Sequence, residues 1–254
     1  MTGDHRGLVA EQFGEQARAY VDSAVHAEGE DLRRLAAMLA AQPGGRALDV
    51  GCGGGHVAYA AARHCREVVA VDLSAAMLGQ VRAEAVSRGL GNIVTREASA
   101  ESLPFEDGGF DWVLSRYSAH HWPRLCKAMA EARRVIRPGG VGVFMDVVAP
   151  AAPLLDTWLQ TFELMRDPGH LRNRTVAQWR QALTEAGFAV DKVFEGRIRL
   201  DFQSWVRRMA TPEPLVTAIR LLQAKMPAEV AEHFALEPDG SFQLDVATLV
   251  VKAV

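Results

Sequence analysis

The chain has 254 residues, of which 49% are hydrophobic and 23% charged, and its formal net charge is −3. This composition provides enough apolar side chains for a packed core and differs from that of disordered chains. A slightly acidic chain lacks the basic surface that attracts nucleic acids and anionic membranes, so neither is expected as a partner. No apolar run approaches the roughly 18 residues of a membrane-spanning helix.

The cysteines and the first twenty residues indicate the cellular compartment of the protein. Cys52, Cys65 and Cys126 are odd in number, far apart and not at metal-binding spacing, which fits a reducing compartment and predicts no metal site. The first twenty residues are polar and charged, unlike a secretory signal. The sequence therefore predicts a cytoplasmic protein.

Short apolar strands alternate with helices over the first 150 residues. Residues 5–42 are predicted to be helical, ending at Pro43-Gly44-Gly45. The strands are predicted at 46–50, 67–71, 93–96, 110–115 and 141–147, and the helices between them at 56–64, 74–88 and 123–136. Connections of this length join parallel strands by right-handed crossovers, and strands that are apolar on both faces require helices on both faces. The pattern predicts an α/β sheet.

The rest of the chain is more helical. Helices are predicted at 151–166, at 175–186 and as two stretches within 202–235, and strands at 189–195 and 242–252, which can pair with each other. No linker-like stretch separates these elements from the sheet. A single domain over 1–254 is therefore expected, with an N-terminal helical cap at 1–45, a core at 46–150, and lid helices with the last two strands at 151–254.

The glycine-rich segment 49–55 (DVGCGGG) is the strongest functional signal. It follows the first predicted strand, and glycines are needed where backbone adopts positive φ or approaches a ligand closely. Asp49 in front of the glycines can receive a cationic amino group but would repel a pyrophosphate. Asp72 ends the second strand, where a carboxylate can accept hydrogen bonds from a ribose diol. His56 stands where a dinucleotide fingerprint has its last glycine.

Four blocks carry a family resemblance: DVGCGGGHV, VVAVDLSAAML, ESLPFEDGGFDWV and RVIRPGG, in this order across residues 46–140. They resemble the class I S-adenosylmethionine-dependent methyltransferases, and most closely the ubiquinone/menaquinone C-methyltransferase-like branch (methyltransferase type 11). The resemblance implies a Rossmann-like, seven-stranded, mostly parallel sheet whose last strand is antiparallel, with helices on both faces and helical lid insertions. It also implies S-adenosylmethionine as cofactor and S-adenosylhomocysteine as product.

The resemblance also implies a set of cofactor-binding residues. Asp72 would accept both ribose hydroxyls, and Leu73 would lie against the adenine. Ser99 stands where the family usually has an Asp, so its contact with the adenine amino group would rely on a hydroxyl. The full set is Tyr20, His26, Asp49, Gly51, Cys52, Gly53, Asp72, Leu73, Met77, Ser99, Ala100, Glu101 and Arg116.

Candidate catalytic residues follow the fourth and fifth strands. His120 or His121 can carry a proton near neutral pH, or can simply pack on a neighbouring element. Asp146 can orient an acceptor hydroxyl or pair with a histidine. Arg166 and Asp167 are predicted to form either a lid turn over the acceptor or a salt-bridged surface turn.

The methyl acceptor is expected to be a small molecule. The Asn-Pro-Pro-Tyr block of amino-methylating DNA enzymes, the Pro-Cys nucleophile of base C5 methylation and the double-Glu loop of arginine methyltransferases are absent. A small, largely apolar metabolite is therefore favoured, with its accepting atom open between O, N and C. A homodimer is compatible with the sequence, which does not fix the oligomeric state.

Two other functions remain open. A protein of this fold can hold the cofactor or its product without transferring a methyl group, and methyl transfer needs no fixed catalytic residue that would separate the two cases. A nicotinamide-dependent oxidoreductase is less favoured, because the late glycine of the dinucleotide fingerprint and a Tyr-x-x-x-Lys pair are both missing.

Overall fold

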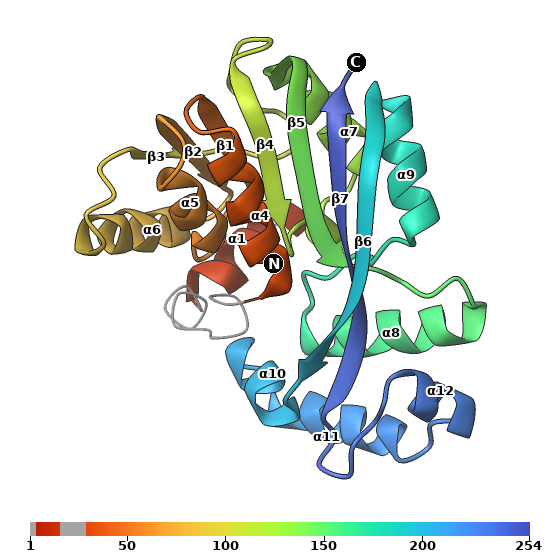
Figure 1. Cartoon of the computed structure of the whole chain (residues 1–254). Helices are drawn as coiled ribbons and strands as arrows, with labels where there is room; N and C mark the ends of the chain where they lie inside the picture. Colours follow the sequence, from red (N-terminus) through yellow and green to blue (C-terminus); the bar gives the residue numbers. More distant parts are fainter. Residues whose placement is uncertain (1–3, 16–28) are drawn as a thin grey trace.

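The computed structural model of the chain describes residues 4–15 and 29–254. Its centre is one seven-stranded sheet with the order β3-β2-β1-β4-β5-β7-β6. Each of the pairs β1/β2, β2/β3, β1/β4 and β4/β5 is parallel, whereas β7 runs antiparallel to both of its neighbours. The predicted Rossmann-like sheet with an antiparallel last strand is confirmed (Figure 1).

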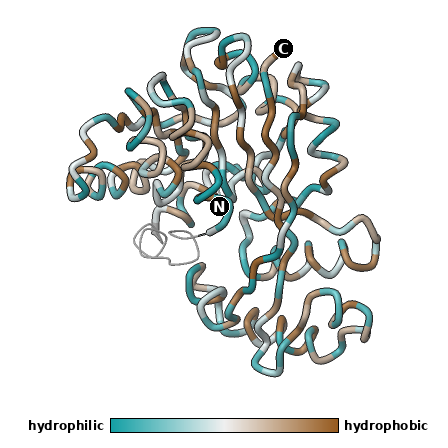
Figure 2. Tube along the Cα trace, viewed as in Figure 1, coloured by the Kyte–Doolittle hydropathy of each residue, from teal (hydrophilic) through white to brown (hydrophobic). Residues whose placement is uncertain are grey.

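The strands are buried on both faces in the middle of the sheet. In β1, Ala47 to Val50 are all buried, and β4 shows the same continuous burial over its second half. Figure 2 shows the hydrophobic colour along the upper part of β7, next to the C-terminus. The bounds are β1 Arg46–Val50, β2 Glu67–Asp72, β3 Ile93–Glu97, β4 Phe110–Arg116, β5 Ile136–Val147, β6 Phe188–Leu200 and β7 Phe242–Ala253.

Helices cover the two faces of the sheet. On one face, α4 (Glu30–Ala41), α5 (His56–Ala62) and α6 (Ala75–Ser87) pack in one apolar cluster with β1 and β2. On the other face, α7 (Leu125–Val135) and α9 (Val176–Glu185) pack in a second cluster. Two covered faces explain why the central strands are apolar throughout.

The last two strands extend beyond the rest of the sheet. The lower halves of β6 and β7 carry a third apolar cluster, which includes Leu200, Phe242 and Leu244. This cluster is completed by α8 (Pro153–Arg166), α10 (Phe202–Arg208), α11 (Glu213–Gln223) and α12 (Ala228–His233). These four helices lie together around one end of the sheet (Figure 1).

Several boundaries differ from the sequence prediction. The strand β6 extends to Leu200 because it pairs with β7 over the full length of both. The strand β5 begins at Ile136, before the predicted turn, because Ile136 pairs with Phe110 across a register shift. Residues 202–235 form three helices rather than two, since Pro212 and Pro227 each stand just before a new helix.

The N-terminal region also departs from one continuous helix. Residues 5–42 contain α1 (His5–Glu15) and α4, and Gly29 is extended immediately before α4. Within residues 4–15 and 29–254, none of the helices is both long enough and apolar enough to cross a membrane.

The strand order fixes where a ligand can bind. Connections from β1 lead outward to β2 and β3, while β4 and β5 lie on the other side of β1. The order therefore reverses between β1 and β4, and open α/β sheets bind ligands at such a point, beyond the carboxyl ends of the strands.

Candidate functional site

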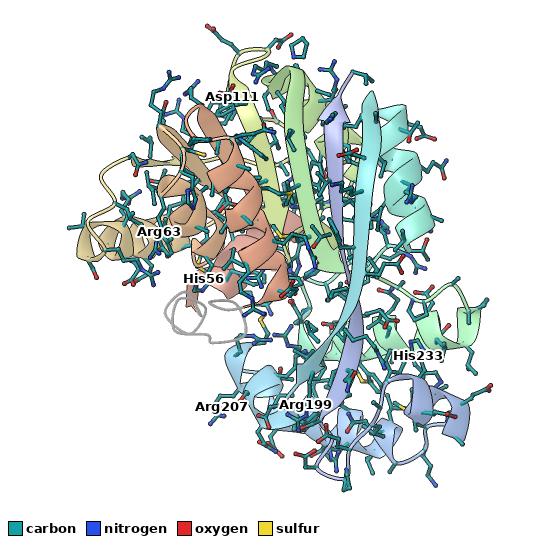
Figure 3. All side chains as sticks on the ribbon, in the orientation of Figure 1. His56, Arg63, Asp111, Arg199, Arg207 and His233 are labelled. Atoms are coloured by element: carbon teal, nitrogen blue, oxygen red, sulfur yellow. The ribbon has the colours of Figure 1, made fainter. Side chains whose placement is uncertain are left out.

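A cleft lies at the carboxyl ends of β1 and β4. Its walls come from the glycine turn after β1, the end of β2, residues 98–101 after β3, and residues 116–123 after β4. Helix α1 supplies a further wall through His5, Arg6, Val9 and Phe13. His56, labelled in Figure 3, begins α5 at the same edge. The cleft thus occupies the position where the strand order reverses.

The turn after β1 depends on glycine at two positions for different reasons. Gly51 has φ +68°, and a Cβ there would lie 1.9 Å from the hydroxyl oxygen of Ser118. Gly53 has φ +48°, and a Cβ there would meet no atom within 4 Å, because the position faces open space. Gly51 therefore allows close packing against the segment after β4, whereas Gly53 only needs a left-handed backbone.

Asp49 is buried at the base of the cleft. Its side chain is 1% exposed, and Oδ2 accepts a hydrogen bond from the Ala58 backbone N–H at 3.0 Å. The other oxygen, Oδ1, is buried and has no hydrogen-bond partner among the residues that the structure describes. Burial raises the pKa of Asp49 to about 8, and the nearby Asp72 carboxyl adds to the rise. A buried carboxyl with an unmet oxygen favours a cationic partner.

Asp72 holds the glycine turn in place. Its Oδ2 accepts the Gly53 N–H at 2.9 Å, and its Oδ1 accepts the Ser74 N–H at 3.0 Å. Burial raises the pKa of Asp72 although these backbone hydrogen bonds oppose the shift. Each carboxylate oxygen has a second lone pair, so Asp72 can still accept hydroxyl hydrogens from a ligand in the cleft.

The far wall of the cleft is held by an ion-pair cluster on Glu101. Its carboxylate is 2.6 Å from Nη2 of Arg6 in α1 and 3.0 Å from Nη2 of Arg124, whose backbone N–H it also accepts. Burial opposes ionisation, but these donors outweigh it and lower the pKa of Glu101. The Ser99 hydroxyl accepts the Glu101 N–H at 3.2 Å. Glu101 therefore fixes α1 against the cleft.

Arg116 and Tyr117 form the wall at the end of β4. The Arg116 guanidinium donates Nε and Nη2 to the two oxygens of Asp31, at 2.6 and 3.1 Å, and so joins β4 to α4. Tyr117 has φ +51°, a left-handed conformation that is strained for an aromatic residue. Its N–H donates to the Met145 carbonyl at 2.8 Å. Such strain is found where a side chain must be aimed at a site.

A second cavity adjoins the cleft. The two share Phe13, Tyr117 and His121, so these three side chains stand at the junction. The second cavity lies toward α8, α10 and the extended ends of β6 and β7. Its apolar wall includes Ile198 and Leu200. Its polar wall consists of His120, Glu163, Arg166, Asp167, Asn173 and Arg208.

His120 and Asp146 form a hydrogen-bonded pair beside the second cavity. Nδ1 of His120 lies 2.7 Å from Oδ1 of Asp146. The carboxylate also accepts the backbone N–H groups of Ala119 and Val147, at 3.0 and 2.9 Å. Burial alone would lower the pKa of His120, but the charge and hydrogen bond of Asp146 outweigh it and raise the pKa. In the neutral ring, Nδ1–H donates to Asp146 and Nε2 is left as a proton acceptor.

The pKa of His121 shifts in the opposite direction from that of His120. Its Nδ1 lies 2.9 Å from the Gly169 carbonyl oxygen, which can only accept, so Nδ1 carries the hydrogen. Burial, followed by the charge of His120, lowers the pKa of His121 to about 4. His121 is therefore neutral near pH 7, at the junction of the two cavities.

With this geometry in place, sequence comparison identifies the family. Residues 48–144 match the family described as "Methyltransferase domain". The uncharacterized protein YafE of Escherichia coli (strain K12) is 47% identical over 192 residues, which are 76% of this chain and 93% of YafE. The uncharacterized methyltransferase YcgJ of Bacillus subtilis (strain 168) is 32% identical over 200 residues, which are 79% of each chain. The chain belongs to the methyltransferase family.

Solved structures agree with this assignment. The crystal structure of YcgJ superposes on this methyltransferase with a TM-score of 0.84 over 88% of this chain and 97% of YcgJ, at 28% identity. A geranyl diphosphate methyltransferase solved in complex with S-adenosylmethionine (SAM) has a TM-score of 0.60 at 18% identity, over 93% of this chain and 95% of that one. The second likeness concerns the fold alone.

Most of the predicted cofactor residues of this methyltransferase line the first cleft. Met77 does not: it is fully buried in α6, where its N–H donates to the capping hydroxyl of Ser74 at 3.3 Å. Tyr20 and His26 lie outside the described residues. The residues that line the cleft are Asp49, Gly51, Cys52, Gly53, Asp72, Leu73, Ser99, Ala100, Glu101 and Arg116.

The predicted catalytic residues come together at the second cavity. His120 and His121 line it, and Asp146 holds His120 from behind. Arg166 and Asp167 are buried and line the same cavity, so the predicted alternative of a salt-bridged surface turn is wrong for both. In the part of the chain that the structure describes, no group of three or more His, Cys, Asp or Glu is arranged to hold a metal ion.

Sequence reasoning missed the α1 wall and much of the second cavity. The α1 residues Arg6 and Phe13 come from a helix with no recognisable motif, and their position depends on the Glu101 ion pair. Asn173 is in an irregular segment with no periodic signal. Glu163 did offer a signal, because it lies three residues before Arg166 next to buried Phe162. A charged pair on an apolar helix face suggests a buried polar site.

Proposed function

We propose that this methyltransferase binds SAM in the first cleft and transfers its methyl group to a small molecule in the second cavity. The observation that carries the proposal is the unpartnered Oδ1 of Asp49 at the base of the cleft. It provides a buried negative group for a ligand with a cationic amino acid part. Asp72 and the open face of Gly53 support the same ligand. The fold neighbour in complex with SAM is consistent with it.

The residues divide between the parts of the cofactor. Asp49 with the Gly51–Gly53 turn would hold the methionine portion, and Asp72 would accept the ribose hydroxyls. Leu73 and the segment from Ser99 to Glu101 would surround the adenine. The carboxylate of Glu101 is already occupied by Arg6 and Arg124, so its proposed part is to hold this wall.

Bound SAM would supply a methyl group that its sulfonium has already activated. The protein then has to align the acceptor and remove one proton. We assign the proton to Nε2 of His120, because Asp146 holds the ring by Nδ1 and raises its pKa. Tyr117, Phe13 and His121 at the junction would exclude water between the two cavities. The acceptor is a small metabolite whose apolar part faces Ile198 and Leu200.

Calorimetry with SAM and with NAD tests the cofactor. SAM is expected to bind in the micromolar range and NAD not at all; tight NAD binding without SAM binding refutes the proposal. A screen of metabolite extract with a labelled methyl donor then tests transfer. Binding of SAM without any labelled product in extracts would favour a cofactor-binding protein instead.

A further inference from the structure

The second cavity contains two buried N–H donors without partners. Arg166 is 7% exposed and Asn173 is 2% exposed, and both line the cavity. Nη2 of Arg166 and Nδ2 of Asn173 have no hydrogen-bond partner among the described residues. A buried donor without a partner is unfavourable, and native proteins seldom keep one without a use. Two such atoms in one cavity point to a missing acceptor group.

The Arg166 guanidinium is fixed so that Nη2 has no partner among the described residues. Its Nε donates to the Trp205 carbonyl oxygen at 3.0 Å, and its carbon Cζ lies 5.2 Å from the centre of the Trp205 ring. Nη1 is 3.7 Å from the Glu163 carboxyl, too far for a hydrogen bond. The side chain is therefore positioned by its neighbours without using Nη2. A preorganised guanidinium edge suits a planar oxyanion.

The acidic side chains of the cavity do not reverse this preference. Oδ1 of Asp167 accepts the Gly169 N–H at 2.8 Å, and its Oδ2 lies 3.8 Å from His121. Burial raises the pKa of Glu163, which disfavours its ionised form in this cavity. Nη2 of Arg166 and Nδ2 of Asn173, whose residues line this cavity, are both donors rather than acceptors.

We propose that the methyl acceptor carries a carboxylate, which Arg166 and Asn173 bind in the second cavity. Two free donors match the two oxygens of a carboxylate better than the three of a phosphate. The apolar remainder of the acceptor lies against Ile198 and Leu200, next to the junction with the cofactor cleft. The identification of the bound carboxylate as part of the methyl acceptor rests on the proposed function. Carboxylate binding itself can be measured without methyl transfer.

The test compares acids with their neutral partners. Thermal shift of the full chain is measured, with and without S-adenosylhomocysteine, against aliphatic and aromatic carboxylic acids of three to ten carbons, each beside its primary amide. Several acids are expected to stabilise the protein more than their amides. The inference is refuted if no acid stabilises the protein, or if amides do so equally. Inorganic phosphate is included, and a stronger effect of phosphate than of every acid also refutes it.

Variants then locate the binding site. Asn173→Ala removes an amide whose Nδ2 has no partner, while the backbone bonds of Asn173 with Gln160 remain. If that amide only fills space, the variant should keep the acid preference. If it binds the carboxylate, affinity for the best acid should fall about tenfold while the unliganded protein is as stable as before or more so.

Arg166→Gln is the stronger variant and has a matched control. It should lower affinity for the best acid by about ten- to hundredfold. Arg207→Gln changes an exposed arginine that projects away from the cavity (Figure 3) and should leave the preference intact. Retained preference in Arg166→Gln and Asn173→Ala would overturn the inference. Loss of S-adenosylhomocysteine binding by the wild type would instead count against the proposed function, so the two failures are distinguishable.

Discussion

If Asp49 must be ionised to receive the cofactor's ammonium group, cofactor affinity should depend on pH. The pKa of Asp49 in the free protein is about 8 because the carboxyl is buried. At pH 6 about 1% of the molecules would then carry the ionised form, and at pH 8 about 50%. Affinity should therefore rise about fiftyfold from pH 6 to pH 8, which corresponds to about 2 kcal/mol.

Calorimetry of SAM binding across this range checks the expectation. Near pH 6.5, binding should release close to one proton, measurable as a dependence of the heat on the ionisation enthalpy of the buffer. Asp49→Asn keeps an oxygen for the Ala58 N–H but cannot ionise. Its affinity should be weak and nearly independent of pH. Asp191→Asn, at an exposed position of β6, is the matched control and should behave as the wild type.

The same shift predicts the stability of the unliganded protein. The folded pKa of Asp49 is raised above the unfolded value near 3.8, so the folded chain holds this proton more tightly. Its contribution to stability is therefore present below pH 4 and is lost as the pH rises toward 8. At pH 8, Asp49→Asn should melt higher than the wild type, by about 2–4 °C for each kcal/mol gained. Equal affinity at pH 6 and pH 8, or an unchanged melting temperature, would refute the role given to Asp49.

Four further single substitutions and one double variant probe the site. Asp72→Ala should weaken SAM binding by about 1–3 kcal/mol in calorimetry, and unchanged affinity would exclude the ribose contact. Gly53→Ala should lower the free energy of unfolding by about 1–2 kcal/mol, because residue 53 has a positive φ. Gly51→Ala should lower the free energy of unfolding more, because its Cβ would lie 1.9 Å from the Ser118 hydroxyl oxygen. The double variant Gly51→Ala/Ser118→Gly should recover part of that loss. His120→Gln should lower kcat about hundredfold and remove the acidic limb of the pH–rate profile without changing SAM affinity; an unaltered profile would make His120 a bystander.

The first cleft, where we propose that the cofactor binds, could be located from sequence because it is built by local rules. The glycine turn, Asp49 and Asp72 all lie at or just after the ends of adjacent strands, so the parallel sheet brings them together. The helix that starts after Ser74 is capped by this residue, with the Ser74 hydroxyl accepting the Met77 N–H. Met77 shows where assigning cofactor contacts from the family resemblance fails, because its position in the helix points its side chain into the core.

The acceptor half could not be predicted because its parts come from distant segments. Glu163 and Arg166 end α8, Asn173 lies in the connection to α9, and Arg208 ends α10. What brings them together is the extension of β6 and β7 beyond the other strands, which carries the third apolar cluster. Sequence patterns gave β6 only to residue 195, and the cavity is built on the part beyond it.

The unmet hydrogen-bonding atoms give the two halves opposite characters. In the first cleft Oδ1 of Asp49, a carboxyl oxygen, has no partner among the described residues, which favours a cation. In the second cavity Nη2 of Arg166 and Nδ2 of Asn173 are N–H donors without a partner among the described residues, which favours an anion. Because the cavities meet at Tyr117, a cationic donor and an anionic acceptor would face each other in a site of low dielectric, where their attraction is strong. The strained backbone of Tyr117 would then have a physical role, because it places the ring at the junction, where the ring would exclude water that would weaken that attraction.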